Sequence, residues 1–325
     1  GLRPKIVNRR TEKGVVMLKG ILLIFLCTFM WALNGNVGAY IFQYKAFTPD
    51  VLVAIRLTTV GVILFVHDLY RSGRYAFRVV RKRENIPAFL LYSIGGILCM
   101  QYGYFTAISY SNAPTTTLIQ YTGMFFVIFV VAIKERTWPK PIVYPILALC
   151  SLGLFLMVTG GDPTSLKVSS KALFWGLVSA VGFTNFNLAP TGLSKTYRSM
   201  EIMGPSMLLG GLLLILLTRP DFTAPTWDAT STLCVLYTII GGTMIPFWAF
   251  LEGARYTGAQ KSSIFSLSEA VFSTIVAMVL YHLTFKTTDL VGMLMIFGSV
   301  LLLCLPEKKK PKKQKPLRER VREED

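Results

Sequence analysis

The sequence predicts an all-α membrane protein with ten transmembrane helices, arranged as an inverted five-plus-five repeat. Composition is the first observation, because 53% of the 325 residues are hydrophobic and only 16% are charged. The mean hydropathy of +0.52 is too high for a soluble domain. Long apolar runs without the alternation of a membrane barrel are the second observation, and a weak internal repeat is the third.

The apolar runs are each close to the roughly 20 residues that cross a bilayer core. Because lipid offers the backbone no hydrogen-bond partners, each run is expected to be a helix. The ten spans are expected at residues 17–43, 51–70, 87–109, 114–133, 142–159, 172–191, 202–218, 230–251, 262–282 and 290–305. The chain is accordingly divided into a cytoplasmic N-terminus (1–16), a first five-helix repeat (17–159), a second five-helix repeat (170–305) and a basic cytoplasmic tail (306–325).

The internal repeat is carried by two stretches in which apolar runs are joined by a short polar elbow. At one constant spacing, Gly95 and Gly96 align with Gly241 and Gly242. Similar residues recur at further aligned positions without a gap, namely Tyr102 with Trp248, Tyr110 with Tyr256, Ala113 with Ala259, Phe126 with Phe272 and Val130 with Val276. With five spans per half, the second half enters the membrane in the opposite orientation, which is typical of secondary transporters with a site between the halves.

Charge predicts the orientation of the bundle, because Lys and Arg gather in cytoplasmic segments. With both termini in the cytoplasm, most of the 34 Lys and Arg residues fall on the inner side of a cell membrane. The outer loops would then hold only Lys45, Lys167, Lys171, Arg219 and Lys286. The same rule accounts for the net charge of +17, so we expect no nucleic acid as a partner.

Catalytic and cofactor motifs are not found in the sequence. Its two histidines, His67 and His282, are far apart, and there is no GxSxG, HExxH or P-loop pattern. The five cysteines all lie in expected spans without a CxxC pair, so neither a disulfide nor a metal site is expected. We therefore expect a protein that is not an enzyme and that needs no cofactor.

Several motifs occur in an order that carries a family resemblance. They are FMWALNGNVGAYIF (29–42), VAIRL (53–57), FTAISYSNAP (105–114), VVAIKERT (130–137), GGTMIPFWAFLEGARYTGAQ (241–260) and SLSEAVFSTIVAMVL (266–280). In this order they resemble the EamA-like branch of the drug/metabolite transporter superfamily. The resemblance implies a permease fold over nearly all the spans and export as a common activity. The chain departs from the family pattern at Ala270, where a proline is frequent, and at His282, where an acidic residue is frequent.

Ionisable residues within spans are candidate functional groups, because charge there is costly and usually faces a cavity or a partner. Glu269 lies about two turns inside the ninth expected span, where a carboxylate could couple transport to protons or pair with a cationic substrate. The alternative is a structural hydrogen bond to the adjacent elbow. Arg56 is the second candidate for coupling, as a counter-charge to Glu269 or a site for an anionic group, and the alternative is snorkelling to the outer headgroups.

Aromatic and amide side chains in the middle of spans form a second set of candidates. Such a mixture could line a pocket for a cation or an amphipathic metabolite, although ordinary packing is the alternative for any single aromatic residue. The predicted substrate-binding set is Trp31, Asn34, Gln101, Tyr102, Gln120, Tyr121, Asn185, Trp248 and Glu269.

Secondary transport of a small metabolite, amino-acid-like or amine-like, is the function that we expect from these features. The mechanism would be alternating access, with export as the expected direction and the lipid bilayer as the surroundings. One alternative is a proton-coupled importer of a cationic nutrient such as a quaternary amine. The other is a membrane scaffold that transports nothing.

Overall fold

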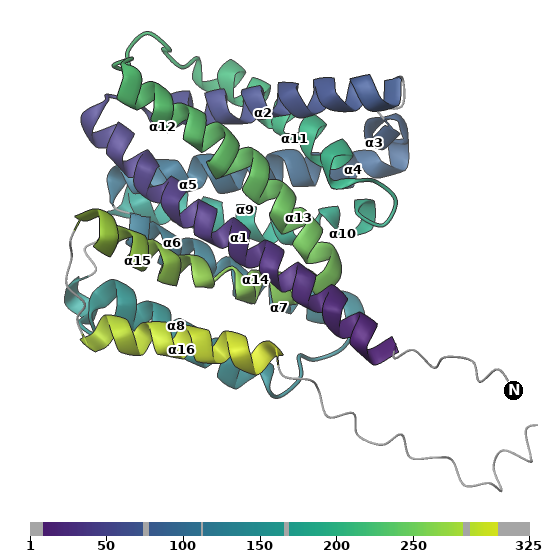
Figure 1. Cartoon of the computed structure of the whole chain (residues 1–325), viewed down its shortest axis with the longest axis vertical. Coiled ribbons are helices and arrows are strands. Elements are labelled where there is room, and N and C mark those ends of the chain that lie inside the picture. The colour runs from purple at the N-terminus through teal and green to yellow at the C-terminus, as the bar shows by residue number, and fades with distance from the viewer. Residues whose placement is uncertain (1–8, 74–77, 112, 166–168, 282–286, 305–325) are drawn as a thin grey trace, which may run out of the picture.

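The computed structural model describes residues 9–73, 78–111, 113–165, 169–281 and 287–304, and within these ranges all regular structure is helical (Figure 1). Residues 1–8 of the predicted N-terminal segment lie outside them, as do His282 and the whole predicted tail (306–325). The first half of the chain forms α1 (Arg9–Tyr44), α2 (Pro49–Ser72), α3 (Arg78–Arg81), η2 (Arg83–Asn85), α4 (Ile86–Leu90), η3 (Leu91–Leu98), α5 (Cys99–Tyr110), α6 (Ala113–Tyr121), α7 (Gly123–Glu135), α8 (Val143–Thr159) and η4 (Pro163–Ser165). The second half forms α9 (Ser170–Leu188), α10 (Pro190–Leu193), α11 (Ser199–Thr218), α12 (Ala229–Ile239), η5 (Ile240–Met244), α13 (Ile245–Thr257), α14 (Ala259–Phe265), α15 (Ser268–Tyr281) and α16 (Thr287–Cys304).

Six helical stretches among the described residues are long and apolar enough to cross a membrane. They are Val15–Tyr44, Pro49–Arg71, Arg83–Tyr110, Ser170–Leu193, Ser199–Thr218 and Ala229–Thr257. The expected spans at 142–159 and 290–305 fall on α8 and α16. Those at 114–133 and 262–282 are each divided into two helices, which the apolar pattern alone did not predict.

The two divided spans are interrupted by side chains that bond back to their own backbone. The Thr122 hydroxyl donates to the Ile119 carbonyl at 2.7 Å, between α6 and α7. Between α14 and α15, the Ser268 hydroxyl donates to the Phe265 carbonyl at 2.8 Å. Hydroxyls that bond in this way compete with the helical ladder and bend it. The two interruptions lie within about two residues of each other at the repeat spacing, so the halves share this local feature.

The π-helical segments η3 and η5 also coincide with the repeat, since each contains one of the aligned glycine pairs. An added Cβ at Gly242 would lie 2.1 Å from the Asn34 Oδ1 atom of α1, so a side chain there would displace Asn34. The wider π-helical turn and the missing side chain together let α1 approach the second half closely.

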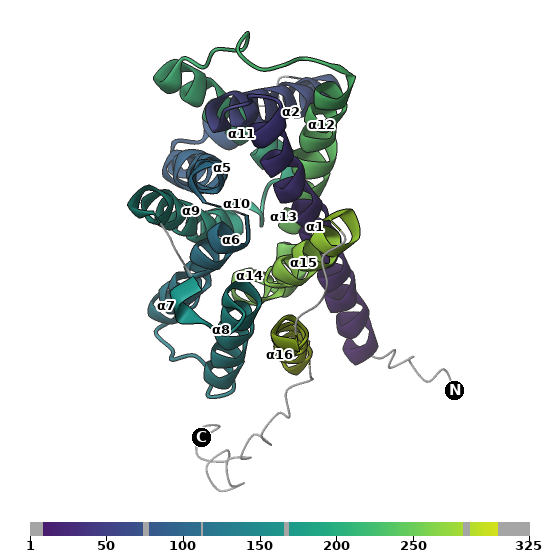
Figure 2. The same ribbon diagram turned by 90° about the vertical axis from the view of Figure 1, so that its left-hand side faces the viewer.

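Packing between helices joins the halves in matching pairs. The first helix of each half packs on the third helix of the other, as α1 on α13 and α9 on η3 and α5. In the same way α1 packs on α15 and α9 on α7, whereas α2 pairs with α11 and α8 with α16. Figures 1 and 2 both place the α2 and α11 pair at one end of the long axis and the α8 and α16 pair at the other. The centre of the molecule is therefore built from both halves.

Apolar side chains cover the outside of this bundle. Large hydrophobic residues such as Phe129, Leu217 and Leu294 are more than half exposed. Arg56, Gln101 and Glu269 are in contrast among the buried polar residues. An apolar exterior with polar groups inside is the distribution expected of helices that face lipid.

Candidate functional site

A cavity at the centre of the bundle lies between α1, α5, α6 and α15. Its volume in this conformation is about 20 Å³, which is room for about one water molecule, so a larger ligand requires the helices to move apart. The lining residues are Trp31, Asn34, Met100, Gln101, Tyr104, Phe105, Gln120 and Glu269. Five of these residues belong to the set that the sequence predicts. Glu269 is the lining residue from the second half, so the cavity lies between the halves.

Glu269 is the acidic group of this cavity, and its side chain is 8% exposed. The break between α14 and α15 places it in the first turn of α15, where the positive end of the helix dipole favours a carboxylate. Tyr121 of α6 donates a hydrogen bond to Glu269 Oε2 at 2.7 Å. No ion pair of Glu269 occurs among the described residues. A cationic group entering the cavity would therefore find a carboxylate without a counter-charge.

Two polar atoms of α1 are left without a partner beside this carboxylate. Within the described part of the chain, the Trp31 indole N–H and the Asn34 Oδ1 atom are buried and form no hydrogen bond. The Trp31 ring packs edge-on against Phe247 with 5.3 Å between centroids, and its tilted contact with Phe250 is at 5.6 Å. Buried polar atoms are nearly always bonded in folded proteins, so these two are exceptions, and the Asn34 Oδ1 atom lies against Gly242.

Arg56 lies behind the wall of the cavity rather than in it. Its side chain is 1% exposed, its Nε donates to Thr243 Oγ1 at 2.9 Å, and one terminal nitrogen donates to the Gly242 carbonyl at 3.1 Å. The guanidinium carbon is 4.7 Å from the centroid of the Phe105 ring, which itself lines the cavity. Arg56 therefore fastens α2 to the π-helical segment η5 and does not snorkel outward.

The other predicted residues lie outside the lining of the central cavity. Tyr102 packs edge-on against Trp175 at 5.2 Å, Asn185 donates to the Gly95 carbonyl at 3.1 Å, and Trp248 packs on the hydrophobic core. The sequence reasoning missed Tyr104, whose hydroxyl is 3.1 Å from Thr117 Oγ1. Tyr104 follows Gln101 by three residues on α5, and this helical spacing was the signal that could have identified it.

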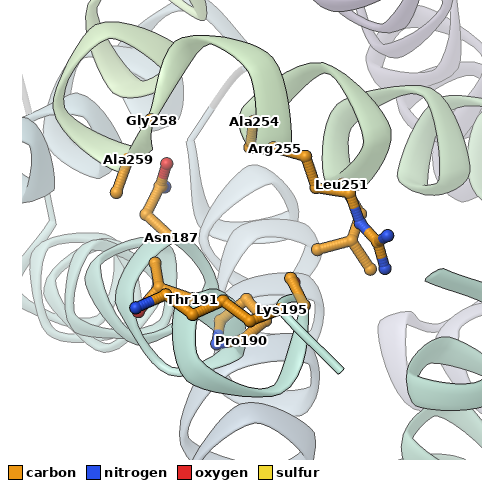
Figure 3. Close-up of a pocket in the computed structure, with 10 residues that line it drawn as sticks. Asn187, Pro190, Thr191, Lys195, Leu251, Ala254, Arg255, Gly258 and Ala259 are labelled. Atoms are coloured by element: carbon orange, nitrogen blue, oxygen red, sulfur yellow. The ribbon is translucent and has the colours of Figure 1, made fainter. Parts of the chain in front are cut away.

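A larger cavity opens at the end of the molecule where α9 and α13 finish. Its volume is about 380 Å³, and Figure 3 shows side chains of α9 and α10 facing those of α13 and α14 across it. Its basic lining residues are Lys195 and Arg255. An adjoining cavity shares Thr191, Gly258 and Ala259 with it. We call this pair of cavities the vestibule.

The opposite end of the molecule is held by contacts between the two halves. Lys45, after α1, forms an ion pair with Asp228, which caps the start of α12. The Thr226 N–H donates to the Lys45 carbonyl at 2.9 Å, and Phe47 packs edge-on against Trp227 at 5.1 Å. The hydrogen bond from Lys45 lowers the pKa of the Asp228 carboxyl to about 2. We call this group of contacts the tie.

Comparison with known sequences decides the family. The EamA-like transporter family matches the chain twice, over residues 18–159 and again over residues 170–305. The chain belongs to the EamA-like transporter family. An uncharacterised inner membrane transporter of Salmonella typhimurium, YicL, is 30% identical over 292 residues, which cover 90% of this chain and 97% of that protein.

A solved crystal structure shares the EamA-like fold of this chain. It aligns with a TM-score of 0.69 at 16% sequence identity, and the match covers 90% of this chain and 96% of that one. At this identity the likeness shows the fold alone. Family and relative together make the protein a membrane transporter of a small molecule.

Proposed function

We propose that this protein is a secondary transporter that moves a small amine-like or amino-acid-like metabolite by alternating access. In this proposal ten helices cross a cell membrane as two inverted five-helix repeats, 17–159 and 170–305, with both termini in the cytoplasm. Lys and Arg of the connections set that orientation. The sequence pattern of the two halves and their matching packing support the inversion.

The environment of Glu269 is the observation that supports an amine-like substrate. It is a buried carboxylate in a cavity that also presents an indole, a phenol and amides, and it has no basic partner among the described residues. Burying an unpaired charge is costly, so the site favours either a bound proton or a bound cation. An ammonium group of the substrate would satisfy the carboxylate, and the unpartnered atoms of Trp31 and Asn34 would take further polar groups.

The two ends of the molecule support alternating access. The vestibule is open at one end, and the tie joins the halves at the other. In the proposed orientation the vestibule faces the cytoplasm, which is where an exporter would take up its substrate. A transport cycle would then require the tie to open and the vestibule to close.

Transport by the purified protein in proteoliposomes tests this proposal. Labelled amino acids, polyamines and quaternary amines would be assayed with and without a pH gradient, for the wild type, Glu269→Gln and the exposed control Glu84→Gln. We expect selective transport that Glu269→Gln reduces at least tenfold and Glu84→Gln leaves unchanged. Equal transport by all three proteins would refute the role of Glu269.

A proton-coupled importer of a quaternary amine is the second candidate. The Trp31 ring in the cavity wall favours it, because an aromatic face beside a carboxylate binds quaternary ammonium groups. A quaternary amine cannot donate an N–H bond, so Glu269→Gln should weaken its binding less than that of a primary amine. Uptake of the quaternary amine that is driven by an inward proton gradient, and that does not require unlabelled substrate inside the vesicles, would favour this candidate. A complete lack of ligand-induced thermal stabilisation and of transport would favour the scaffold instead.

A further inference from the structure

Tyr121 has one hydroxyl hydrogen but two acceptors within reach. Its oxygen lies 2.7 Å from Glu269 Oε2 and 2.6 Å from the Ser266 carbonyl oxygen. Both distances are those of good O–H···O hydrogen bonds. All three residues are buried, with exposed fractions of 2% for Tyr121, 8% for Glu269 and 0% for Ser266. One hydrogen cannot occupy two contacts fully, so the protonation state of Glu269 decides whether both are satisfied.

An ionised Glu269 would have no hydrogen to give. The single phenolic hydrogen would then point to the carboxylate, and the contact between Tyr121 and the Ser266 carbonyl would be oxygen against oxygen in a buried place. A protonated Glu269 supplies the second hydrogen, because its acid group donates to the Tyr121 oxygen while Tyr121 donates to Ser266. Two oxygen atoms at this distance with no hydrogen between them repel each other, so the two short contacts together fit the neutral acid.

Among the described residues, no other side chain is hydrogen-bonded to the Tyr121 oxygen or to Glu269 Oε2. The titratable side chains that face it are Cys27 from α1, Tyr104 from α5 and Tyr121 from α6. From α6 the cavity wall also includes Gln120, and among the described side chains of α16 none is charged and in contact with it. The Arg56 guanidinium lies against the Phe105 ring and bonds to η5 instead.

Ser266 stands at the break between α14 and α15, and Tyr121 stands at the break between α6 and α7. The Ser266 carbonyl also accepts the Glu269 N–H at 3.0 Å, which is the tight turn that starts α15. The three oxygens therefore link the interrupted helices of both halves. A change at Glu269 is passed directly to the backbone of the α14–α15 break.

We infer that Tyr121 is a positioning residue that couples the state of Glu269 to the α14–α15 break. When Glu269 is protonated, Tyr121 holds the Ser266 carbonyl and the break is fixed. When the proton passes to water that enters the cavity, the phenolic hydrogen turns to Glu269 Oε2, and the Ser266 carbonyl keeps only the Glu269 N–H as a donor. No other bond changes, and an arriving ammonium group then balances the carboxylate. This inference rests on the proposed transport function, because it describes how the same site would drive the conformational change.

Two measurements on the full chain in detergent or lipid test the inference without needing a substrate. Infrared difference spectra would follow the protonated carboxyl band that Glu269→Gln removes. Hydrogen exchange of the segment 259–281 would report the break over the same pH range. In the wild type, we expect exchange at the break to rise as the carboxyl band disappears.

Tyr121→Phe removes the hydroxyl and keeps the ring. We expect the Glu269 carboxyl band of this variant to disappear about one to two pH units higher than in the wild type, because the ionised Glu269 loses the hydrogen bond from the Tyr121 hydroxyl. Exchange at the break should become independent of pH. The exposed control Tyr110→Phe should behave as the wild type does. An unshifted band together with unchanged exchange would overturn the inference and leave Tyr121 a packing residue.

Glu269→Gln provides a second variant if Tyr121→Phe does not fold. The glutamine amide can donate to Tyr121 as the neutral acid does, so exchange at the break should stay at its low-pH level at every pH. Exchange that still rises with pH in this variant would overturn the inference. A titrating band and a responsive break in a protein that transports none of the panel would support the inference while refuting the proposed function. Active transport with Glu269 ionised throughout would instead support the proposed function and refute the inference.

Discussion

The broken helices α6–α7 and α14–α15 occupy equivalent places in the two halves but carry different chemistry. Both follow an elbow and begin with an alanine, Ala113 or Ala259, and both are interrupted near their middle. At the repeat spacing, Gly123 corresponds to Glu269. The same backbone feature therefore presents no side chain in one half and a carboxylate in the other.

The surroundings of the two positions explain the difference. An added Cβ at Gly123 would lie 2.4 Å from the Ala180 carbonyl oxygen, so α7 packs directly on the α9 backbone. Glu269 instead borders the central cavity. The two halves therefore share a similar scaffold, in which one break is a packing surface and the other forms the acidic wall of the candidate site.

Substitution of Gly123 should give the largest effect on stability. We expect Gly123→Ala to lower the unfolding free energy by about 3 kcal/mol, because the new methyl group meets backbone that cannot rotate away. Thermal unfolding of the detergent-purified protein measures the change. Gly192→Ala is the matched control, since no atom lies within 4 Å of a Cβ added there. Equal melting temperatures for the two variants would show that α7 and α9 are not tightly packed.

Much of the cavity was predictable from the sequence, and the reason is physical. Amide, carboxyl and indole groups within apolar spans face the interior, so Asn34, Gln101 and Glu269 could be named from composition and spacing. The choice of Tyr102 over Tyr104 depended on which face of α5 turns inward, and two adjacent aromatic residues do not settle that. The breaks were missed because neither contains proline, and the one at Ser266 is contacted by Tyr121 from a distant helix.

Arg56 offers a second comparison between equivalent positions, because Ile202 lies opposite it at the repeat spacing and is also fully buried. Arg56→Leu would leave the Gly242 carbonyl without its donor and Thr243 without a charged partner. We expect a loss of about 1–3 kcal/mol, against less than about 1.5 kcal/mol for Ile202→Leu. Denaturant unfolding of the two variants checks the order. A larger loss from Ile202→Leu would mean that the Arg56 bonds contribute no net stability.

Asn185 and Asn34 form a third comparison, in which one substitution should affect stability and the other should affect substrate binding. Asn185 donates to the Gly95 carbonyl, whereas Asn34 beside Gly242 keeps an unpartnered oxygen at the cavity. Asn185→Leu should cost about 1 kcal/mol of stability and leave substrate affinity unchanged. Asn34→Leu should weaken substrate binding with little loss of stability. Melting temperatures with and without a transported ligand distinguish them, and the opposite assignment would place the substrate near Asn185.

The tie at Lys45 and Asp228 should give the smallest effect, because exposed ion pairs contribute little to stability. The pKa of Asp228 is lowered to about 2 from an ordinary value near 4, so its contribution is present above about pH 4 and is lost only as the pH falls through about 2. The pair is therefore constant between pH 5 and 8. Asparagine can still accept the Ser231 N–H that Asp228 caps, so Asp228→Asn removes the ion pair alone.

Transport by Asp228→Asn should change by the same factor at every pH in that window, with a melting temperature close to that of the wild type. The reason is that neither partner of the tie titrates there, so the variant alters how easily the halves separate but not what the proton does. Glu269→Gln should instead flatten the pH profile itself. If Asp228→Asn changed the shape of the pH profile of transport, the pH-sensitive step would lie at the tie between the halves and not at the α14–α15 break.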